Sequence, residues 1–429
     1  MIPHARARFN QTAEVLAQSA DSRIPVDAFI DQYFRANRKM GSKDRAFLAE
    51  TIYGCLRRRR ELQALYEPLT GRVTDTAPWL IATYLLKYGG WSGRALAEAG
   101  FSGDTDVLAA RVRTANSALF PFAVRANLPD WLTERLLAQF GEDETLKLAD
   151  ALNRPATVDI RVNTLKTSRD GLQAQLREEG YELTPTPYSP FGLRHGKRGP
   201  LFNSRAFEEG LFELQDEGSQ LIAVLVDAKP KEKIVDFCAG AGGKSLHIAA
   251  MMQNKGSIYA CDVATRRLER LKPRLKRAGV DIIQRLLVRD EWDEQMKPLY
   301  GKMDAVLVDA PCSGTGTLRR NPDIKWKDID LDKLRVTQQR ILAAAARLVK
   351  PGGRLVYATC SLLDEENSAV TAALLAAHPG FKTIPAGEVL ARAGITIADA
   401  CNAGGALRLL PQRHGTDGFY ALTMQRLAP

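Results

Sequence analysis

The stretch KIVDFCAGAGGKSLHIAAMM, residues 233–252, passes from a short apolar strand pattern through a glycine-rich turn into a helix pattern. Its glycines, Gly240, Gly242 and Gly243, allow the backbone to pass close to a ligand because they carry no Cβ atom. A strand, a glycine turn and a helix in this order are typical of the first ligand-binding turn of a Rossmann-like sheet. This stretch therefore predicts the fold of the C-terminal half.

The same order of strand and helix patterns repeats from Lys231 onward. Further strand patterns are SIYACD, DAVLVDAP and GRLVYATC, and the helix patterns between them include RRLERLKPRLKRAG and LDKLRVTQQRILAAAARLV. Such alternation predicts an α/β fold, with a parallel sheet that carries helices on both faces. Ligands of these sheets bind beyond the carboxyl ends of the strands.

An acidic residue, Asp262, ends the second of these strand patterns, 22 residues after Gly240. An acid at this position suits the two hydroxyls of a ribose. The glycine pattern differs from G-x-G-x-x-G because its third position is Ser245, and no glycine lies five residues before Gly243, so the full P-loop pattern is also missing. S-adenosylmethionine, which has a ribose but no pyrophosphate, therefore fits better than a dinucleotide. The alternative is a strand-to-helix turn that binds nothing.

The six cysteines lie far apart in the chain, at Cys55, Cys238, Cys261, Cys312, Cys360 and Cys401. No pair has C-x-x-C spacing, which argues against a zinc site or a thioredoxin-like site. Disulfides are not expected in a reducing cytosol. Each cysteine is therefore either a small buried residue or a reactive thiol.

Two of these thiols follow strand patterns of the predicted sheet. Asp309 and Cys312 flank the point where one strand breaks at Ala310-Pro311, and Cys360 ends YATC, residues 357–360. Both should face the crevice that holds Gly240. Two thiols and a carboxylate beside a methyl donor suit methylation of a pyrimidine, because a thiolate that adds to C6 makes C5 nucleophilic. A carboxyl near N3 would stabilise the adduct, and a base must then remove the C5 proton. The alternative is a pair of structural cysteines.

The chain N-terminal to this sheet divides into two further segments. Residues 1–153 show helix patterns, and we predict helices from an N-cap at Ser42 with Asp44 in the first turn, and at 79–87, 129–140 and 144–153. The run Arg57–Arg60 near the end of the Ser42 helix could contact phosphates or be solvated. Residues 154–228 alternate between strand and helix patterns and predict a small α/β unit, which leaves 229–429 as the third domain.

The composition agrees with an ordinary globular protein of more than one domain. Of its 429 residues, 45% are hydrophobic and 26% charged, and no run of 18 apolar residues predicts a membrane span. The N-terminus lacks a hydrophobic signal core, so we expect a cytoplasmic protein. The net charge is +10, of which residues 231–429, with 30 basic and 21 acidic side chains, carry +9. The excess indicates a polyanionic partner or only a solvated surface.

Five sequence blocks together resemble the RsmB/Nop/Sun family of RNA cytosine-5 methyltransferases. They are LQDEGSQL, DFCAGAGGKSL, LVDAPCSGTGTLRRNPDIKW, YATCSLLDEEN and RLLPQRHGTDGFYA, in this order over about 200 residues. The resemblance implies a Rossmann-like class I methyltransferase domain that uses S-adenosylmethionine and no metal. MGSKDRAFLAETIYGCLRRRREL is similar to the NusB-like helical extension of bacterial members, and VDIRVNTLK resembles their small RNA-binding unit.

The resemblance also implies a role for each matching residue. Cys360 would be the nucleophile, Cys312 the thiol that assists proton removal or product release, and Asp309 the acid that contacts the base and the methyl donor, with Lys244 beside it. The cofactor would lie against the glycine loop, Asp262 would bind its ribose, and Asp290 would lie near its adenine. The glycine-loop residues are Cys238, Ala239, Gly240, Ala241, Gly242, Gly243 and Lys244.

One departure from the family pattern lies in this loop. The family commonly reads A-P-G-G-K where this chain has Gly240-Ala241-Gly242-Gly243-Lys244, which should loosen the loop but keep its backbone donors.

We expect a monomer that methylates ribosomal RNA, with the small-subunit 16S RNA as substrate. Alternatives are a transfer RNA methyltransferase and a non-catalytic RNA-binding ribosome-assembly factor on the same fold. A DNA methyltransferase, with Cys312 as nucleophile, is disfavoured by Cys360 and by the helical extension.

Overall fold

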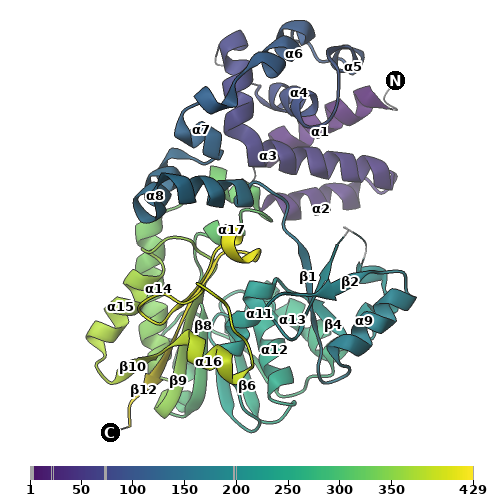
Figure 1. The fold of residues 1–429 in the computed structure, drawn as a ribbon. Helices are drawn as coiled ribbons and strands as arrows, with labels where there is room; N and C mark the ends of the chain where they lie inside the picture. Colours follow the sequence, from purple (N-terminus) through teal and green to yellow (C-terminus); the bar gives the residue numbers. More distant parts are fainter. Residues whose placement is uncertain are drawn as a thin grey trace. The chain divides into compact units, whose positions relative to one another are not determined.

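The computed structural model describes residues 4–20, 22, 24–71, 75–196, 199 and 201–428. The chain forms two compact units, which are coloured by sequence position in Figure 1. Unit 1 combines Met1–Pro155 with a short later segment, Thr317–Asp328, and unit 2 combines Ala156–Gly316 with Ile329–Pro429. The sequence did not predict that the Thr317–Asp328 segment packs with the N-terminal helices.

Unit 1 is helical in its described part, as predicted. Its core is apolar and includes Ile52, Leu62 and Ile81, which are fully buried. The helices are α1 (Ala5–Ala20), α2 (Val26–Ala36), α3 (Ser42–Thr70), α4 (Ala77–Lys87), α5 (Gly93–Glu98), α6 (Thr105–Thr114), η1 (Ser117–Leu119), α7 (Phe122–Ala126), α8 (Asp130–Leu152) and η5 (Pro322–Trp326).

The boundaries of three predicted helices differ from the structure. Ser42 is the first residue of α3 and not its N-cap, because Gly41 occupies that position and offers no side-chain acceptor. Asp44 lies in the first turn, as predicted, where its carboxylate binds Arg8 Nε at 2.8 Å. The two helices predicted at 129–140 and 144–153 are the two parts of α8, which breaks at Gly141, where φ is 75° and ψ 175°.

The four arginines of the Arg57–Arg60 run lie in the middle of α3 and serve packing. Arg57 is buried and donates to the Arg319 carbonyl, while Arg60 pairs with both oxygens of Asp130. Arg58 and Arg59 lie over the rings of Tyr88 and Trp326. The interpretation of this run as a free phosphate-binding patch is therefore wrong for Arg57 and Arg60, because other groups of unit 1 already bind their guanidinium groups.

Unit 2 begins with a small antiparallel sheet in the strand order β2-β3-β1-β4. Alternate residues of its strands, such as Ile160 and Val162, pack with Leu172 and Leu176 of a helix into one core. The elements are β1 (Val158–Val162), α9 (Arg169–Glu178), β2 (Leu183–Pro185), β3 (Gly192–His195), η2 (Leu201–Asn203), α10 (Arg205–Glu208) and β4 (Phe212–Leu214).

The second sheet of unit 2 has eight strands in the order β10-β12-β9-β8-β5-β6-β7, and β11 pairs with β12. Strands β9, β8, β5, β6 and β7 are parallel, as predicted, but β12 pairs antiparallel with both of its neighbours, β9 and β10, so the sheet is mixed. A strand that pairs antiparallel with its neighbour, as β12 does with β9, needs no helical crossover, and the sequence pattern did not distinguish the two cases.

This sheet is covered by helices on both faces. Successive strand residues alternate between two cores, as Ile234 and Val235 of β5 do. Its strands are β5 (Lys233–Asp236), β6 (Ser257–Asp262), β7 (Ile283–Leu287), β8 (Met303–Asp309), β9 (Val349–Thr359), β10 (Phe381–Ile384), β11 (Leu407–Leu409) and β12 (Phe419–Arg426). Its helices are α11 (Glu217–Val224), α12 (Gly243–Met251), α13 (Thr265–Ala278), η3 (Glu294–Leu299), η4 (Thr315–Thr317), α14 (Leu331–Ala346), α15 (Ser368–Ala377), α16 (Ala386–Arg392) and α17 (Pro411–His414).

The segment RRLERLKPRLKRAG forms helix α13, as predicted, which buries Leu268 and Leu271 and leaves Arg266 and Arg270 exposed. Arg274 has a different role, because its guanidinium binds Glu213 and the Ala241 carbonyl. It is therefore not a surface cation. In the described ranges, no helix has the length and apolar character needed to cross a membrane.

Candidate active site

The two predicted thiols lie next to each other in unit 2. Cys360 directly follows β9 and Cys312 lies three residues after β8, and these two strands are parallel neighbours. The Sγ atoms are 3.4 Å apart, within hydrogen-bond reach for sulfur but far beyond a disulfide bond. The Gly316 N–H also donates to the Cys360 carbonyl at 2.9 Å. The two loops therefore form one site in which either sulfur can assist the other.

The surroundings of Cys312 favour its protonated form. The pKa of Cys312 is raised well above its ordinary value, first by the hydrogen bond with Cys360, then by burial, and then by the negative charges of Cys360 and Glu366. A thiol that keeps its proton can donate it to the neighbouring sulfur. The arrangement therefore suits Cys312 as the sulfur of the pair that carries a proton.

Lys244 and Asp309 form an ion pair beside these thiols, with Nζ and Oδ2 2.5 Å apart. Lys244 is the second residue of α12, and Asp309 is the last residue of β8, the strand that neighbours β5. Burial lowers the pKa of Lys244, but the charges of Asp309, Asp236 and Cys360 outweigh it, so that the pKa is raised overall. Lys244 is therefore cationic, although Asp309 balances part of the charge it could offer to Cys360.

Two glycines of the glycine loop have backbone conformations that suit glycine. Gly240 and Gly242 have φ angles of 58° and 77°, which only glycine adopts readily. A Cβ atom at Gly242 would collide with Leu271 of α13, but a Cβ atom at Gly240 would meet nothing within 4 Å. The Gly240 backbone therefore faces open space, where a ligand can approach it closely.

Asp262 lies beside this loop, at the end of β6. It is buried, and its two carboxylate oxygens accept hydrogen bonds from the backbone N–H groups of Gly240, at 2.9 Å, and Ala264, at 2.8 Å. Each oxygen keeps a second lone pair for a hydroxyl donor. The donor set of the loop and the acceptor set of Asp262 therefore fit a ribose-containing ligand such as S-adenosylmethionine.

Two arginines hold the glycine loop by its carbonyl groups. Arg274 of α13 donates to the Ala241 carbonyl at 2.5 Å, and Arg161 of β1 donates to the Gly243 carbonyl at 2.7 Å. Glu213 of β4 binds Arg274 at 2.9 Å. Sequence reasoning missed all three residues, since they lie outside the loop and belong to ordinary strand and helix patterns.

A buried acid, Asp236, lies at the end of β5 and was also missed. Its Oδ2 accepts a hydrogen bond from Ser245 Oγ at 2.6 Å, while Oδ1 has no partner among the described groups. Burial, with smaller effects from neighbouring charges, raises the pKa of Asp236 to about 7. The sequence signal that could have revealed Asp236 is an acidic residue at the end of an apolar strand pattern.

Three further residues that the sequence predicted for the site are Cys238, Ala239 and Asp290. Cys238 is a wall residue of the loop, and burial raises the pKa of its thiol well above its ordinary value. The Ala239 N–H donates to the Cys261 carbonyl at 2.8 Å and fixes the start of the loop. Asp290 lies three residues after β7 and is exposed, where its carboxylate accepts from the Trp292 N–H.

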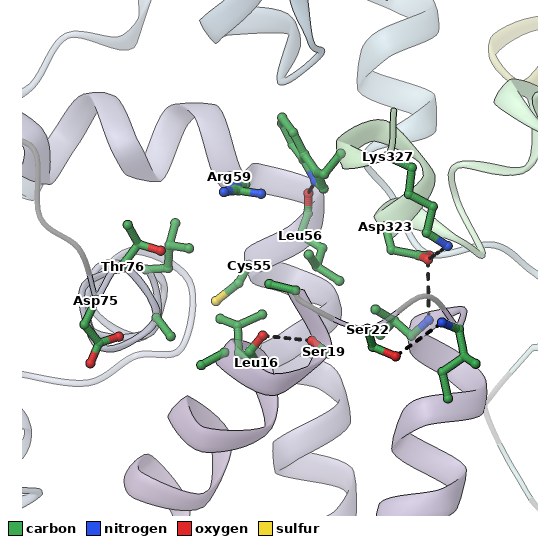
Figure 2. A pocket seen from close by; sticks show the side chains of 17 residues that line it. Leu16, Ser19, Ser22, Cys55, Leu56, Arg59, Asp75, Thr76, Asp323 and Lys327 are labelled. Carbon is green, nitrogen blue, oxygen red and sulfur yellow. Dashed lines mark hydrogen bonds and ion pairs between the residues drawn. The ribbon is translucent and has the colours of Figure 1, made fainter. Parts of the chain in front are cut away.

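Unit 1 contains a cavity of about 300 Å³ that holds none of the predicted site residues. Figure 2 shows its walls, which carry Cys55 and Arg59 from α3, Thr76 before α4, and Asp323 and Lys327 from the later segment. Cys55 is fully buried there, and burial raises its pKa. Over the described part of the chain, no cluster of three or more His, Cys, Asp or Glu side chains could hold a metal ion.

Comparison with known proteins gives a consistent result. The model of the 16S rRNA methyltransferase RsmB/F family matches residues 223–425, and the ferredoxin-like domain of RsmF/B-like methyltransferases matches residues 128–200. The probable ribosomal RNA small subunit methyltransferase B of Synechocystis is 33% identical, over 94% of this chain and 95% of its own. The protein with the same name from Bacillus subtilis is 29% identical over 91% and 92% of the two chains.

Solved structures show the same fold. The crystal structure of PH0851 superposes with a TM-score of 0.81 and 27% identity over 99% of both chains. A methyltransferase homologue from Pyrococcus horikoshii has a TM-score of 0.62 and 28% identity over 73% of this chain and 100% of its own. The crystal structure of NSun6 from the same organism, solved with SFG, has a TM-score of 0.61 at 24% identity, over 70% of this chain and 99% of its own.

Proposed function

From the premise that this chain belongs to the 16S rRNA methyltransferase RsmB/F family, we propose that it methylates C5 of a cytosine in small-subunit ribosomal RNA. The proposed methyl donor is S-adenosylmethionine, and the reaction passes through a covalent adduct between Cys360 and C6 of the base. The observation that carries the proposal is the 3.4 Å separation of two thiols at adjacent strand ends, beside the Lys244–Asp309 pair.

The chemistry assigned to Cys360 explains why a thiol is required. Its thiolate forms a bond to C6, and the electrons of the C5–C6 double bond move to C5, which then carries the nucleophilic pair. S-adenosylmethionine supplies an electrophilic methyl group to that carbon. A general base takes the C5 proton, and the electron pair of that C–H bond restores the C5–C6 double bond while the bond from C6 to Sγ breaks, so that Cys360 leaves as the thiolate.

Cys312, Asp309 and Lys244 support these steps in the proposal. Cys312 keeps its proton beside Cys360 and can stabilise the departing thiolate by donating a hydrogen bond to it. Asp309 would contact the polar edge of the cytosine near N3, and Lys244 holds its carboxylate in place. The glycine loop and Asp262 would hold the methyl donor, with Asp262 on the ribose.

Several observations support ribosomal RNA as the substrate. Curated relatives that match this chain over 90% or more of its length are named ribosomal RNA small subunit methyltransferase B. The positive charge of residues 231–429 suits a polyanionic substrate. The target cytosine must be single-stranded or flipped out, because stacking shields C6. We further propose that the enzyme acts in the cytoplasm.

The test is a methylation assay with purified protein, labelled S-adenosylmethionine and unmodified small-subunit ribosomal RNA, followed by bisulfite sequencing of the product. We expect one protected cytosine with the wild-type protein and none with Cys360→Ala. Transfer RNA in a parallel reaction tests the nearest rival substrate. Binding of ribosomal RNA without any methyl transfer would instead support the assembly-factor alternative.

A further inference from the structure

The fully buried carboxylate of Glu366 lies between the loops that carry the two thiols. Each thiol is followed by a serine, and the hydroxyls of Ser313 and Ser361 both donate to the same oxygen, Oε2 of Glu366. The other oxygen, Oε1, accepts the Ser313 N–H at 2.8 Å and Gln338 Nε2 at 3.0 Å. One carboxylate therefore holds the residue after Cys312 and the residue after Cys360 at the same time.

Further hydrogen bonds extend this connection. Gln338 of α14 also donates to the carbonyl of Pro311, the residue before Cys312, at 2.9 Å. Thr315 Oγ1 accepts the Leu362 N–H at 2.9 Å and lies 3.2 Å from Ser361 Oγ. The loops around both thiols are thus fixed to a common centre, and any motion of Glu366 must move both.

The carboxylate of Glu366 has no cationic partner among the groups that bind it. All four groups that bind its carboxylate are uncharged donors, and no lysine or arginine in the described ranges forms an ion pair with it. Four donors match the acceptor capacity of an ionised carboxylate. Such a network is costly unless it is complete, because buried polar groups without partners are penalised.

The charge of Glu366 acts on the neighbouring thiol. It is one of the causes that raise the pKa of Cys312, after the hydrogen bond with Cys360, burial and the charge of Cys360. The ionisable groups around Cys312 are Cys360, Glu366 and Tyr357, and the Lys244–Asp309 pair lies beyond Cys360. Of these, only Glu366 also fixes both loops by hydrogen bonds.

We propose that Glu366 is a positioning residue for the two-thiol chemistry. It keeps the Cys312 and Cys360 sulfurs within hydrogen-bond distance and its negative charge helps to retain the proton on Cys312, so that Cys360 is the sulfur that attacks. This inference rests on the proposed function, but its main test needs neither RNA nor a methyl donor.

The test compares wild type with Glu366→Gln, which keeps the size of the side chain and removes its charge. Each protein is treated with iodoacetamide over a range of pH, and modification of Cys312 and Cys360 is followed separately by mass spectrometry of their peptides. We expect the Cys312 profile to move to lower pH in Glu366→Gln. Glu388→Gln, which removes an exposed carboxylate on α16, is the matched control and should leave the profile unchanged.

Activity measurements give the second readout. With the RNA substrate, Glu366→Gln should lower kcat by about 10-fold or more and change KM little, because misplacement of reacting groups affects the chemical step. Ser361→Ala removes one donor but no charge, so it should lower kcat without shifting the Cys312 profile, and it replaces Glu366→Gln if that variant does not fold. An unchanged Cys312 profile and an unchanged kcat in Glu366→Gln would overturn the proposal.

Loss of activity in Glu366→Gln with an unchanged Cys312 profile would count against the role of the Glu366 charge in thiol protonation. Absence of methylation by the wild-type protein, combined with the expected shift of the Cys312 profile, would instead refute the proposed function and leave the role of Glu366 in thiol protonation standing. The two failures are therefore distinguishable.

Discussion

At the scale of single residues, the 3.4 Å contact between Cys312 and Cys360 makes their roles separable only by kinetics. Cys360→Ala should be inactive and form no adduct, because no thiolate can then bond to C6. Cys312→Ala should form the adduct and methylate but release RNA slowly, so a protein–RNA species should accumulate. Denaturing gel electrophoresis with labelled RNA detects this species, and finding it only in Cys360→Ala would exchange the two roles.

Asp262 offers a second prediction at this scale. Asp262→Ala removes the expected ribose partner and also the acceptor of the Gly240 N–H, so S-adenosylmethionine should bind more weakly by roughly 1.5–3 kcal/mol. Calorimetry measures the change. Asp262→Asn keeps an acceptor oxygen for the loop and should lose less. Equal affinity of Asp262→Ala and wild type would show that the ribose lies elsewhere.

Asp236 makes the stability of the fold decrease as pH rises, because its pKa in the folded protein is raised to about 7. Its ordinary pKa is near 4, so between about pH 4 and 7 the unfolded chain ionises while the folded protein keeps the proton. The fold is therefore penalised as pH rises through this window, by at most about 4 kcal/mol above pH 7. Asp236→Asn should raise Tm at pH 8 and change it little at pH 4. Calorimetric scans at both pH values check this, and an equal change at both would contradict the assignment.

The sequence predicted the position of a site residue correctly where the residues next to it in the chain mark the end of a strand. Cys312 and Cys360 were placed correctly at strand ends because Pro311 and the strand pattern before Cys360 mark those ends. Glu366 was not predicted, since an acid within the run 364–366 looks like a solvated turn. Its burial depends on serines that are distant in sequence and near only in the fold.

At the scale of elements, the glycine loop depends on α13 and β4 for its shape. Arg274 binds the Ala241 carbonyl and is itself held by Glu213. Arg274→Met should keep the packing of the side-chain stem, free the loop, and weaken S-adenosylmethionine binding several-fold, as calorimetry can measure. Glu388→Gln, a distant charge removal, serves as the control.

The glycine loop has Ala241 where the family pattern has a proline, and this difference allows a second test of how Arg274 supports the loop. The φ angle of Ala241 is not positive, and its N–H donates to no group in the described chain, which are two of the conditions that a proline at this position requires. Proline at a compatible site stabilises by about 0.4–1 kcal/mol through the unfolded state. Ala241→Pro should therefore restore part of the affinity lost in Arg274→Met. A further loss in the double variant would show that the loop needs its freedom.

The elements themselves were predicted best where a periodic pattern and a turn signal coincide. The helices and parallel strands around β5, β6 and β8 followed the sequence closely. The direction of β12 and the continuation of α3 past Arg57–Arg60 did not, since the partners of a strand and the contacts of these arginines are tertiary properties. Strand patterns carry no information about the direction of the neighbouring strand.

At the scale of the whole molecule, unit 1 is built from two separate stretches of chain. The segment Thr317–Asp328 begins five residues after Cys312 and completes the core of the N-terminal helices. Lys325 is fully buried there and donates to the carbonyls of Arg57 and Asn127, at 3.2 and 3.0 Å, and to Asn153 Oδ1 at 2.5 Å. The helical unit and the catalytic loop are therefore covalently continuous.

The environment of Lys325 shows how much unit 1 depends on this segment. Burial, together with the positive charges of Arg58 and Arg57, lowers its pKa well below the ordinary value. Three buried oxygen atoms would lack this donor if the side chain were removed, and each unsatisfied group costs about 1–3 kcal/mol. The neighbouring Trp326 adds a hydrogen bond to the Leu56 carbonyl at 2.9 Å.

The last prediction follows from this construction. A fragment of residues 1–155 should lack a cooperative thermal transition, because its core is open where Lys325 and Trp326 belong. Addition of a synthetic peptide covering residues 315–330 should restore the transition, and its Tm should rise with peptide concentration, as for any ligand that binds only the folded state. The same peptide with Lys325→Met should bind more weakly, and a scrambled peptide should have no effect. Calorimetry and circular dichroism measure both quantities. A fragment that melts cooperatively at the same temperature with and without the peptide would show that the N-terminal helices fold on their own, and that the segment after Cys312 only rests on them.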